Sequence, residues 1–289
     1  MVTAFECWHT IDVYMETACR SVAADDGCVM KASRYPLLSL VLILMFSAVP
    51  AEGAQAVRIA TPDISNLLTE SGDGIYQRLM NRAVAGLPWQ ATEQFYPYKR
   101  ALMVFQQGDA DCIYSFTDVL RNKLGQDAVV ASYPLGKFAF YIFTAKGAPA
   151  PAGLDELRGQ EVGAVIGHET YLDPILSGRD LKVFWSKSDA MNLAMLKHGR
   201  FDIMIAALPD VAPLLDQLSY QPAHPLLESF DRLTCHNTRR NRAFVKALSA
   251  SLKRLKSEGV YQDIAGPLYL DFKTDQAPEG VNKAGRTPD

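Results

Sequence analysis

The chain contains the same sequence pattern twice: a helix-like segment is followed by a glycine, an aspartate and a short apolar run. The first copy covers residues 100–116 and has Gly108 as its glycine. The second copy covers residues 190–207 and has Gly199 in the same role. Glycine commonly ends a helix in the left-handed conformation, and short apolar runs are typical of buried strands. Two copies of this unit predict two similar α/β lobes.

The size and composition of the chain are those of a globular protein with room for two domains. It has 289 residues, of which 48% are hydrophobic and 21% are charged. The formal net charge of −3 provides no general attraction to nucleic acid or to acidic membranes, so neither is expected as a partner. The basic residues are scattered except at Arg239, Arg240 and Arg242, which we expect at the solvated start of a helix.

The first part of the chain has the pattern of a secretory leader. Residues 30–56 combine a basic start, an apolar run at 37–49 and small residues at cleavage spacing, so we interpret them as a signal peptide cleaved near Ala54 or Ala56. A buried core helix is the alternative, but it does not explain the flanking residues. The run is too short for a membrane span of about 20 residues. Residues 1–29 are then an upstream extension foreign to the native protein, which we expect in the periplasm.

The mature part begins with the order of a parallel sheet covered by helices. Residues 57–60 read as a strand, residues 75–84 as a helix and residues 89–96 as a second strand. The first copy of the repeated unit then adds a helix and a third strand. This alternation predicts an α/β lobe with mainly parallel strands.

A second lobe is predicted as an insertion into the first. Residues 128–146 form one long strand or two strands joined at 134–136, and a second α/β unit follows. Residues 226–235 are extended again, and residues 241–258 are a basic amphipathic helix. The predicted boundaries are lobe 1 at 57–132 and 233–275, lobe 2 with its hinge strands at 133–232, and a loose tail at 276–289. Two strands therefore cross between the lobes and form a hinge.

The chain resembles the bacterial extracellular solute-binding proteins of family 3, the receptors of polar amino-acid ABC transporters. The resemblance covers residues 57–269 and depends on the order of several short motifs. These are the signal peptide, VRIA, YPYKRAL, the GDADC and GRFD turns, SFTDVLR, RGQEVGAVIGHET and LKRLKSEGVYQDI. It implies an α/β, two-lobed, type II periplasmic-binding-protein fold with the second lobe inserted into the first and two hinge crossings.

The resemblance also implies a function. A monomeric receptor would close its lobes on a small carboxylate-bearing ligand, an amino acid or organic acid, and present it to an inner-membrane ABC transporter permease. No cofactor and no enzymatic activity are expected, because the chain has no GxSxG, HExxH or P-loop motif. Two alternatives remain: a secreted dehydratase-like enzyme with Glu169 or His168 as acid or base, and a sensor module for a membrane receptor.

Several ligand contacts in lobe 1 follow from the resemblance. Arg121 would hold the ligand carboxylate, although its spacing from Thr117 is one residue longer than usual in the family. Ser115 and Thr117 would add hydroxyl contacts or simply cap a strand end. Tyr98 would pack against the ligand or belong to the lobe core. Asp63 would face the cleft or make a turn.

The contacts in lobe 2 would come from the segment 167–170. Backbone N–H groups at a helix start can hold an anionic group there, with His168, Glu169 and Thr170 beside it, although His168 also fits an ordinary surface histidine. The place where the family usually has an aspartate for the ligand ammonium is apolar here, at 206–207, and Asp210 comes later in the chain. Either the ligand lacks a standard α-amino group, or Glu169 or Asp63 provides the charge.

The cysteines do not form a metal-binding pattern. The five of them are dispersed and no CxxC or HxxxH pair occurs, so no metal site is expected. Cys7, Cys19 and Cys28 lie in the leader region. The resembled fold places Cys112 and Cys235 on neighbouring strands, where a disulfide and two buried thiols are the alternatives in an oxidising compartment.

Overall fold

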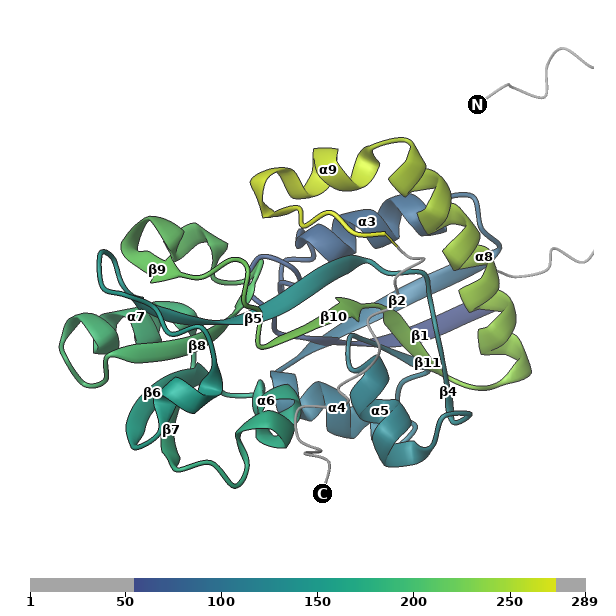
Figure 1. The fold of residues 1–289 in the computed structure, drawn as a ribbon. Coiled ribbons are helices and arrows are strands. Elements are labelled where there is room, and N and C mark those ends of the chain that lie inside the picture. Colours follow the sequence, from purple (N-terminus) through teal and green to yellow (C-terminus); the bar gives the residue numbers. More distant parts are fainter. Residues whose placement is uncertain (1–54, 274–289) are drawn as a thin grey trace, which may run out of the picture. The chain divides into compact units, whose positions relative to one another are not determined.

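The computed structural model describes residues 55–273 and contains two β-sheets flanked by helices (Figure 1). The first sheet has the strand order β2-β1-β3-β11-β4. Its strands are β1 (Gln55–Pro62), β2 (Trp89–Tyr96), β3 (Cys112–Tyr114), β4 (Val129–Ala131) and β11 (Leu233–His236). Strand β1 pairs in parallel with β2 and β3, whereas β11 runs antiparallel to both of its neighbours.

The second sheet is formed entirely by the chain between β4 and β11. Its order is β10-β5-β8-β6-β7, and β9 also pairs with β5. The strands are β5 (Gly136–Ala145), β6 (Gln160–Val165), β7 (Leu181–Ser186), β8 (Ile203–Leu208), β9 (Leu218–Tyr220) and β10 (Leu227–Asp231). Strand β6 is parallel to β7 and β8, and β5 is antiparallel to β8.

The helices follow the strands in the predicted alternation. The first lobe has α3 (Ile75–Val84), α4 (Tyr98–Gln106), α5 (Thr117–Leu124), α8 (Arg239–Ser257), α9 (Val260–Ala265) and the 3₁₀ turn η3 (Gly266–Leu268). The second has α6 (Glu169–Leu176), α7 (Asp189–Lys197) and the 3₁₀ turns η1 (Leu154–Leu157) and η2 (Ala212–Gln217). Both copies of the repeated unit are present, since α4 leads to β3 and α7 leads to β8. Gly108 and Gly199 have φ values of 82° and 67°, as expected for helix-ending glycines.

Capping and burial explain why these segments form helices. Ser188 accepts a hydrogen bond from the backbone N–H of Met191 at the start of α7, and Thr238 does the same for Asn241 at the start of α8. Helix α3 has an apolar face, whose members pack into the core of the first lobe: Ile75, Tyr76, Leu79, Met80 and Ala83. Burying one such large side chain stabilises the fold by about 1.5–3 kcal/mol.

The two sheets are connected by two crossings of the chain. The first crossing joins β4 to β5, and the second joins β10 to β11 through the single residue Arg232. Strands β5 and β10 lie side by side with Gly136 opposite Asp231. The region 128–146 is therefore two strands, the second of the two forms predicted for it. The predicted fold class, with an inserted second lobe and two crossings, is confirmed.

The segment after β3 has the polar residues typical of a loop, but it is helical from Thr117 to Leu124. Ser115 and Phe116 have φ values of 67° and 60° and turn the chain from β3 into α5. Val119 and Leu120 are buried on α5, and Asp118 lies in its first turn, where a negative charge favours a helix. The polar appearance of the segment thus concealed one short amphipathic helix.

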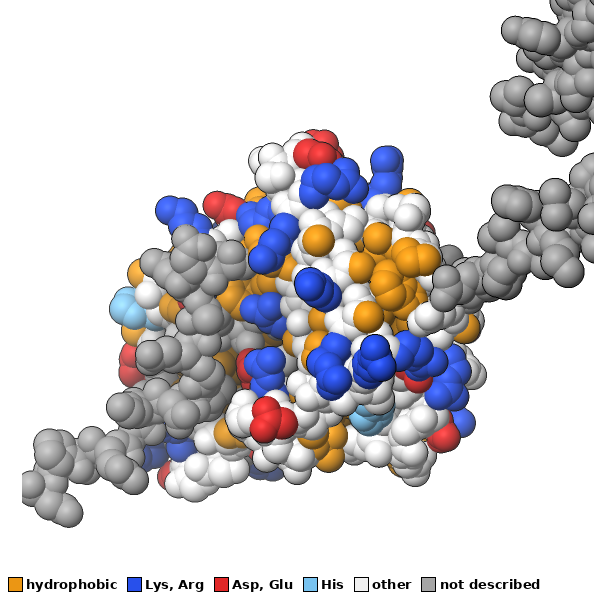
Figure 2. Space-filling model, turned by 90° about the vertical axis from the view of Figure 1, so that its right-hand side faces the viewer, with side chains coloured by type: hydrophobic (Ala, Val, Ile, Leu, Met, Phe, Trp, Pro, Cys, Tyr) orange, Lys and Arg blue, Asp and Glu red, His pale blue; other side chains and the backbone are white. Residues whose placement is uncertain are grey.

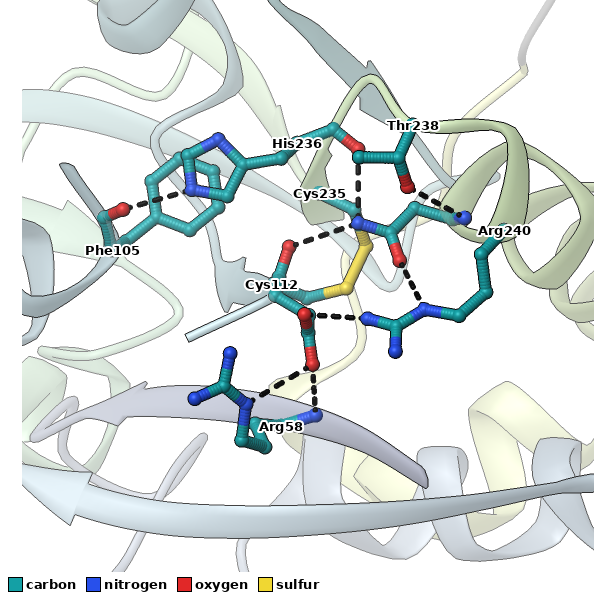
Figure 3. Close-up of polar contacts among 9 residues, drawn as sticks. Arg58, Phe105, Cys112, Cys235, His236, Thr238 and Arg240 are labelled. Atoms are coloured by element: carbon teal, nitrogen blue, oxygen red, sulfur yellow. Dashed lines mark hydrogen bonds and ion pairs between the residues drawn. A yellow bond between two sulfur atoms is a disulfide. The ribbon is translucent and has the colours of Figure 1, made fainter. Parts of the chain in front are cut away.

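A polar network joins β3, β11 and the start of α8 (Figure 3). Cys112 and Cys235 form a disulfide between the two neighbouring strands. Next to it, the Asp111 carboxylate pairs with Arg58 at 3.3 Å and with Arg240 at 2.5 Å. Burial would raise the pKa of Asp111, but hydrogen bonds from Arg58 and the charge of Arg240 hold that pKa below its ordinary value.

Helix α8 begins two residues earlier than predicted, and its basic residues lie on its exposed side. Arg239, Arg240 and Arg242 are all exposed in the first turn, as expected of a solvated helix start. Figure 2 shows the face on which α8 lies, and Lys and Arg side chains gather there around a small apolar area.

Some predictions fall outside the part of the chain that the structure describes. These are the upstream extension at 1–29 with its three cysteines, the signal peptide up to residue 54, and the tail at 276–289. Between residues 55 and 273, no helix has the length and apolar character that crossing a membrane requires.

Candidate functional site

A cavity of about 360 Å³ lies between segments of the first and second lobes. From the first lobe it is lined by Asp63, Ile64, Ser65, Pro97, Tyr98 and Lys99. From the second lobe it is lined by Val165, Ile166, His168, Lys187, Ser188, Asp189 and Asp210. Its charged side chains are three aspartates, Asp63, Asp189 and Asp210, and two lysines, Lys99 and Lys187.

The fold brings these residues together at the carboxyl ends of strands. Asp63 directly follows β1, Tyr98 comes two residues after β2, and Asp210 comes two residues after β8. His168 and Asp189 follow β6 and β7 at the starts of α6 and α7. Ligands of α/β proteins characteristically bind at this edge of the sheet, because the loops there are free to carry polar groups. The position of the cavity therefore follows from the α/β topology of both lobes.

Asp210 and Asp189 are the most unusual carboxylates of the cavity. The Asp210 side chain is only 9% exposed, and burial raises its pKa well above the ordinary value, with the charges of Asp189 and Asp231 adding to the effect. One carboxylate oxygen of Asp189 is buried and has no hydrogen-bond partner. Burial raises the pKa of Asp189 to about 7. Among residues 55–273, no lysine or arginine forms an ion pair with either carboxylate.

His168 lies beside Asp210 and is nearly as deeply buried. Its side chain is 8% exposed, and its Nε2 lies 3.8 Å from an oxygen of Asp210, beyond hydrogen-bond distance. Its Nδ1 has no hydrogen-bond partner. Burial lowers the pKa of His168 to about 4, although the charge of Glu169 opposes the shift. The imidazole is therefore neutral at neutral pH and does not neutralise Asp210.

A smaller cavity of about 20 Å³ shares Tyr98, His168 and Asp210 with the main one and is also lined by Ser115 and Asp231. The Asp231 carboxylate accepts hydrogen bonds from Ser115 Oγ at 2.5 Å and from Tyr76 Oη at 2.8 Å. Burial raises the pKa of Asp231 to about 6, and these hydrogen bonds oppose the shift. Asp231 is therefore a third buried carboxylate next to the site, and its hydrogen-bond partners are neutral hydroxyl groups.

The structure separates the residues that the sequence grouped as a site. Asp63, Tyr98 and His168 line the main cavity, and Ser115 lines the smaller one. Glu169 and Thr170 line a different groove of about 550 Å³ beside α4 and α6. Thr117 is buried, with its hydroxyl 2.6 Å from that of Thr234. Arg121 lines none of these three cavities.

Arg121 follows a buried residue on α5 and lies near another arginine. One residue turns an α-helix by about 100°, so the longer spacing directs Arg121 to a different side of α5 from the residue before it. That preceding residue, Leu120, is fully buried. Arg121 lies near Arg232 instead, whose pKa is lowered by burial and by the charge of Arg121.

The backbone donors before α6 are also not free. The N–H of Gly167 donates a hydrogen bond to the carboxylate of Glu169, and Lys99 pairs with the same carboxylate at 2.8 Å. The Thr170 hydroxyl donates to the carbonyl of Gly167 at 2.8 Å. The chain's own acid thus occupies the place where the sequence predicted an anionic ligand group.

Reasoning from sequence missed the acidic side of the site. Asp189 and Lys187 were not considered, and Asp210 was set aside because it comes late after the apolar run. The length of the apolar run could have pointed to Asp210. Strand β8 continues to Leu208, so its carboxyl end comes later in the chain than expected and lies two residues before Asp210. The signal for Asp189 was its place beside the helix-capping Ser188, at the carboxyl end of the preceding strand.

Replacement of Gly167 by alanine is expected to disturb the contact between the lobes. Gly167 has a φ of 108°, and an added Cβ would lie 2.4 Å from the Tyr98 ring. Strain and overlap together should cost about 2–4 kcal/mol of unfolding free energy, measured by denaturant titration. Gly178→Ala is the matched control, because Gly178 has a φ of 77° with open space around it and tests strain alone. An equal cost for both variants would contradict a close Tyr98 contact.

The buried acids predict that the ligand-free protein becomes less stable as pH rises. Asp189, Asp210 and Asp231 have raised pKa values, so the folded state binds more protons at these sites than the unfolded state, and stability is lost as pH rises through them. His168, with its lowered pKa, opposes this below about pH 6.5. The other charged side chains of the main cavity are Asp63, Lys99 and Lys187.

We therefore expect the melting temperature to fall by several degrees between about pH 5.5 and pH 8. Differential scanning calorimetry on protein freed of ligand measures this directly. Asp210→Asn should flatten the profile. A melting temperature that rises over this interval would show that the three carboxylates are already compensated.

Comparison with known proteins supports the fold. No protein-family model matches the sequence, and the search of curated proteins returned no match. Solved structures do match. The GluR0 ligand-binding core from Nostoc punctiforme, in complex with L-glutamate, is 15% identical with a TM-score of 0.59, and the match covers 72% of this chain and 97% of that one.

Two transport proteins match similarly. The amino-acid ABC transporter substrate-binding protein AbpA from Streptococcus pneumoniae, bound to L-arginine, is 16% identical with a TM-score of 0.57 over 76% of this chain and 96% of its own. A putative L-cystine ABC transporter from Listeria monocytogenes is 15% identical with a TM-score of 0.60 over 75% of this chain and 98% of its own. The chain thus has the two-lobed fold of amino-acid-binding proteins of ABC transporters and of GluR0 ligand-binding cores, as the sequence resemblance implied.

Proposed function

We propose that the protein is a periplasmic solute receptor that captures a small organic ligand between its lobes and presents it to an inner-membrane ABC transporter. The observation that carries this proposal is the cavity lined from both lobes, in which Asp189 and His168 have buried polar atoms without a partner. Buried polar groups are normally hydrogen-bonded, so these two atoms are candidates for contact with a ligand.

The geometry of the cavity suits a small molecule. Its volume of about 360 Å³ is within the usual range for ligand pockets. Because only two crossings connect the lobes, a rotation about them would open and close the cavity. Closure on a ligand then produces a form of the receptor that a membrane partner can distinguish from the open one.

An amino acid or a related compound is the first ligand class to test. The proteins of similar fold were solved with L-glutamate and L-arginine. In this chain, Asp210 and Asp189 are placed to accept hydrogen bonds from a ligand ammonium group, and Tyr98 offers an aromatic surface. The receptor acts as a monomer without a cofactor in this proposal.

An enzyme on the same fold is the second candidate, and one observation favours it. His168 and Asp210 face each other at 3.8 Å, and burial shifts their pKa values in opposite directions. A neutral imidazole beside a carboxyl group with a raised pKa is a usable pair for proton transfer. The receptor remains the better proposal, because neither group has a nucleophile or a further orienting partner next to it among the described hydrogen bonds.

A ligand screen with a turnover assay separates the two candidates. Mature protein is unfolded and refolded to remove carried-over ligand, then melted in the presence of amino acids, amines, keto acids and dicarboxylates. A true ligand should raise the melting temperature with increasing concentration. Recovery of the ligand unchanged after long incubation supports the receptor. Its conversion to a product supports the enzyme.

A further inference from the structure

We infer that the site recognises its ligand as an organic cation, through Asp210 and Asp189, and that a carboxylate on the ligand is not required. This inference rests on the proposed receptor function and names the ligand class of the same cavity. It departs from the sequence-based expectation, in which a carboxylate held by Arg121 was the main feature of the ligand.

The charges around the cavity favour a cation. Asp63, Asp189 and Asp210 line it, against two lysines, Lys99 and Lys187. Lys99 is already paired with Glu169 at 2.8 Å. The smaller adjoining cavity adds Asp231, whose partners are neutral hydroxyls. A positively charged ligand would bring the charge that these carboxylates lack.

Two buried polar atoms of the cavity have no hydrogen-bond partner among residues 55–273, and both belong to residues beside or near Asp210. Asp210 has a side chain only 9% exposed and has no cationic neighbour closer than His168, which is neutral at neutral pH. One oxygen of Asp189 is buried without a partner, and so is Nδ1 of His168. A primary ammonium has three N–H donors and a guanidinium has five, so either group can supply donors to such a set.

The positions that could hold a ligand carboxylate are occupied or absent. Glu169 takes the N–H of Gly167 at the start of α6. Arg121 does not line the cavity, and Lys187, an exposed side chain, is the one lining cation without an ion pair among the described residues. A carboxylate would therefore gain little here, while it would lie close to buried carboxylates of the same charge.

An organic cation fits better than a metal ion. Within residues 55–273, no group of three or more histidine, cysteine or acidic side chains is placed so that it could hold a metal. The Tyr98 side chain also lines the cavity, and aromatic rings attract ammonium and guanidinium groups. Spaced carboxylates beside an aromatic ring suit a ligand with one or two nitrogen cations.

Pairs of ligands that differ only in the α-carboxylate test the inference. Isothermal titration calorimetry on refolded, ligand-free protein would compare agmatine with arginine and putrescine with ornithine, with glutamate as the acidic reference. We expect at least one amine to bind as tightly as its amino acid, within about threefold, and glutamate to bind at least about a hundredfold more weakly. Asp210→Asn should abolish binding of the amine, whereas Asp202→Asn, at an exposed position before β8, should not.

The outcomes separate the inference from the receptor proposal. If removal of the carboxylate weakens binding by about a hundredfold or more, or if glutamate alone binds, the inference is wrong and the receptor function stands. If none of the five compounds binds, the inference is overturned for these amines, and the broader melting screen decides the receptor function separately. Retained amine binding in Asp210→Asn would also overturn it.

Discussion

Replacement of Asp210 by asparagine is expected to weaken ligand binding by about a hundredfold or more while making the ligand-free protein more stable. The carboxylate is buried, its pKa is raised, and its nearest basic group, His168, is neutral. Without a ligand, ionising this buried carboxylate destabilises the fold, so above its raised pKa the neutral amide should add about 1–3 kcal/mol of stability. With a cationic ligand, the same charge provides an attraction that the amide cannot replace.

The opposite signs of the two effects make the experiment decisive. A residue that merely fills the core would lose stability on substitution and affect binding only through the fold. Calorimetric titration measures the binding, and denaturant unfolding at a series of pH values measures the stability, because the cost of burying the ionised carboxylate grows as pH rises through its raised pKa. Asp202→Asn serves as the control for removal of one acid near β8. A destabilised Asp210→Asn protein with normal affinity would remove Asp210 from the site.

Loss of the disulfide between Cys112 and Cys235 is expected to cost about 4–5 kcal/mol of unfolding free energy, on the chain-entropy estimate. The two cysteines are 123 residues apart, and the segment between them contains the whole second sheet. Closing so long a loop restricts the unfolded chain strongly. Neither cysteine lines the cavity, so the folded double variant Cys112→Ala/Cys235→Ala should bind ligand normally.

Two measurements separate the covalent bond from the packing of the sulfur atoms. Denaturant titration of the double-alanine variant gives the total loss, and titration of the native protein with reductant gives the loss from the bond alone. Both cysteines of the disulfide are fully buried, so reduction of the bond should be slow without denaturant and fast at the unfolding midpoint. A loss below about 1 kcal/mol in both measurements would mean that the unfolded chain is already restricted.

Local sequence signals predicted the fold well because most helices and strands have a recognisable pattern within a few residues. Gly108 and Gly199 end helices in both copies of the repeated unit, and the apolar runs after them are the buried strands β3 and β8. The order of strands and helices then leaves few ways to build a sheet. The exception was α5, where polar residues at its start hid two buried positions, Val119 and Leu120.

The site was harder to predict because its residues come from five separate strand ends. Asp63, Tyr98 and His168 were among the candidates, and they line one cavity. Arg121 was expected there from the resemblance, although its spacing from Thr117 is one residue longer than usual, and one additional residue in a helix changes the direction of a side chain by about 100°. Asp210 was set aside because it comes late in the chain after the apolar run. It lines the cavity because β8 extends to Leu208.

The sequence by itself determined the two α/β lobes, their alternation of elements and the candidates for most of the lining. Periodicity, helix-ending glycines and apolar runs are properties of neighbouring residues, and they act before any long-range contact forms. The tertiary structure alone decided which acidic side chains are buried together and which hydrogen-bond donors near the cavity are already paired. Burial and pairing depend on atoms that are distant along the chain. The desolvation that shifts the pKa values of Asp189 and Asp210 therefore exists only once the two lobes are packed around them.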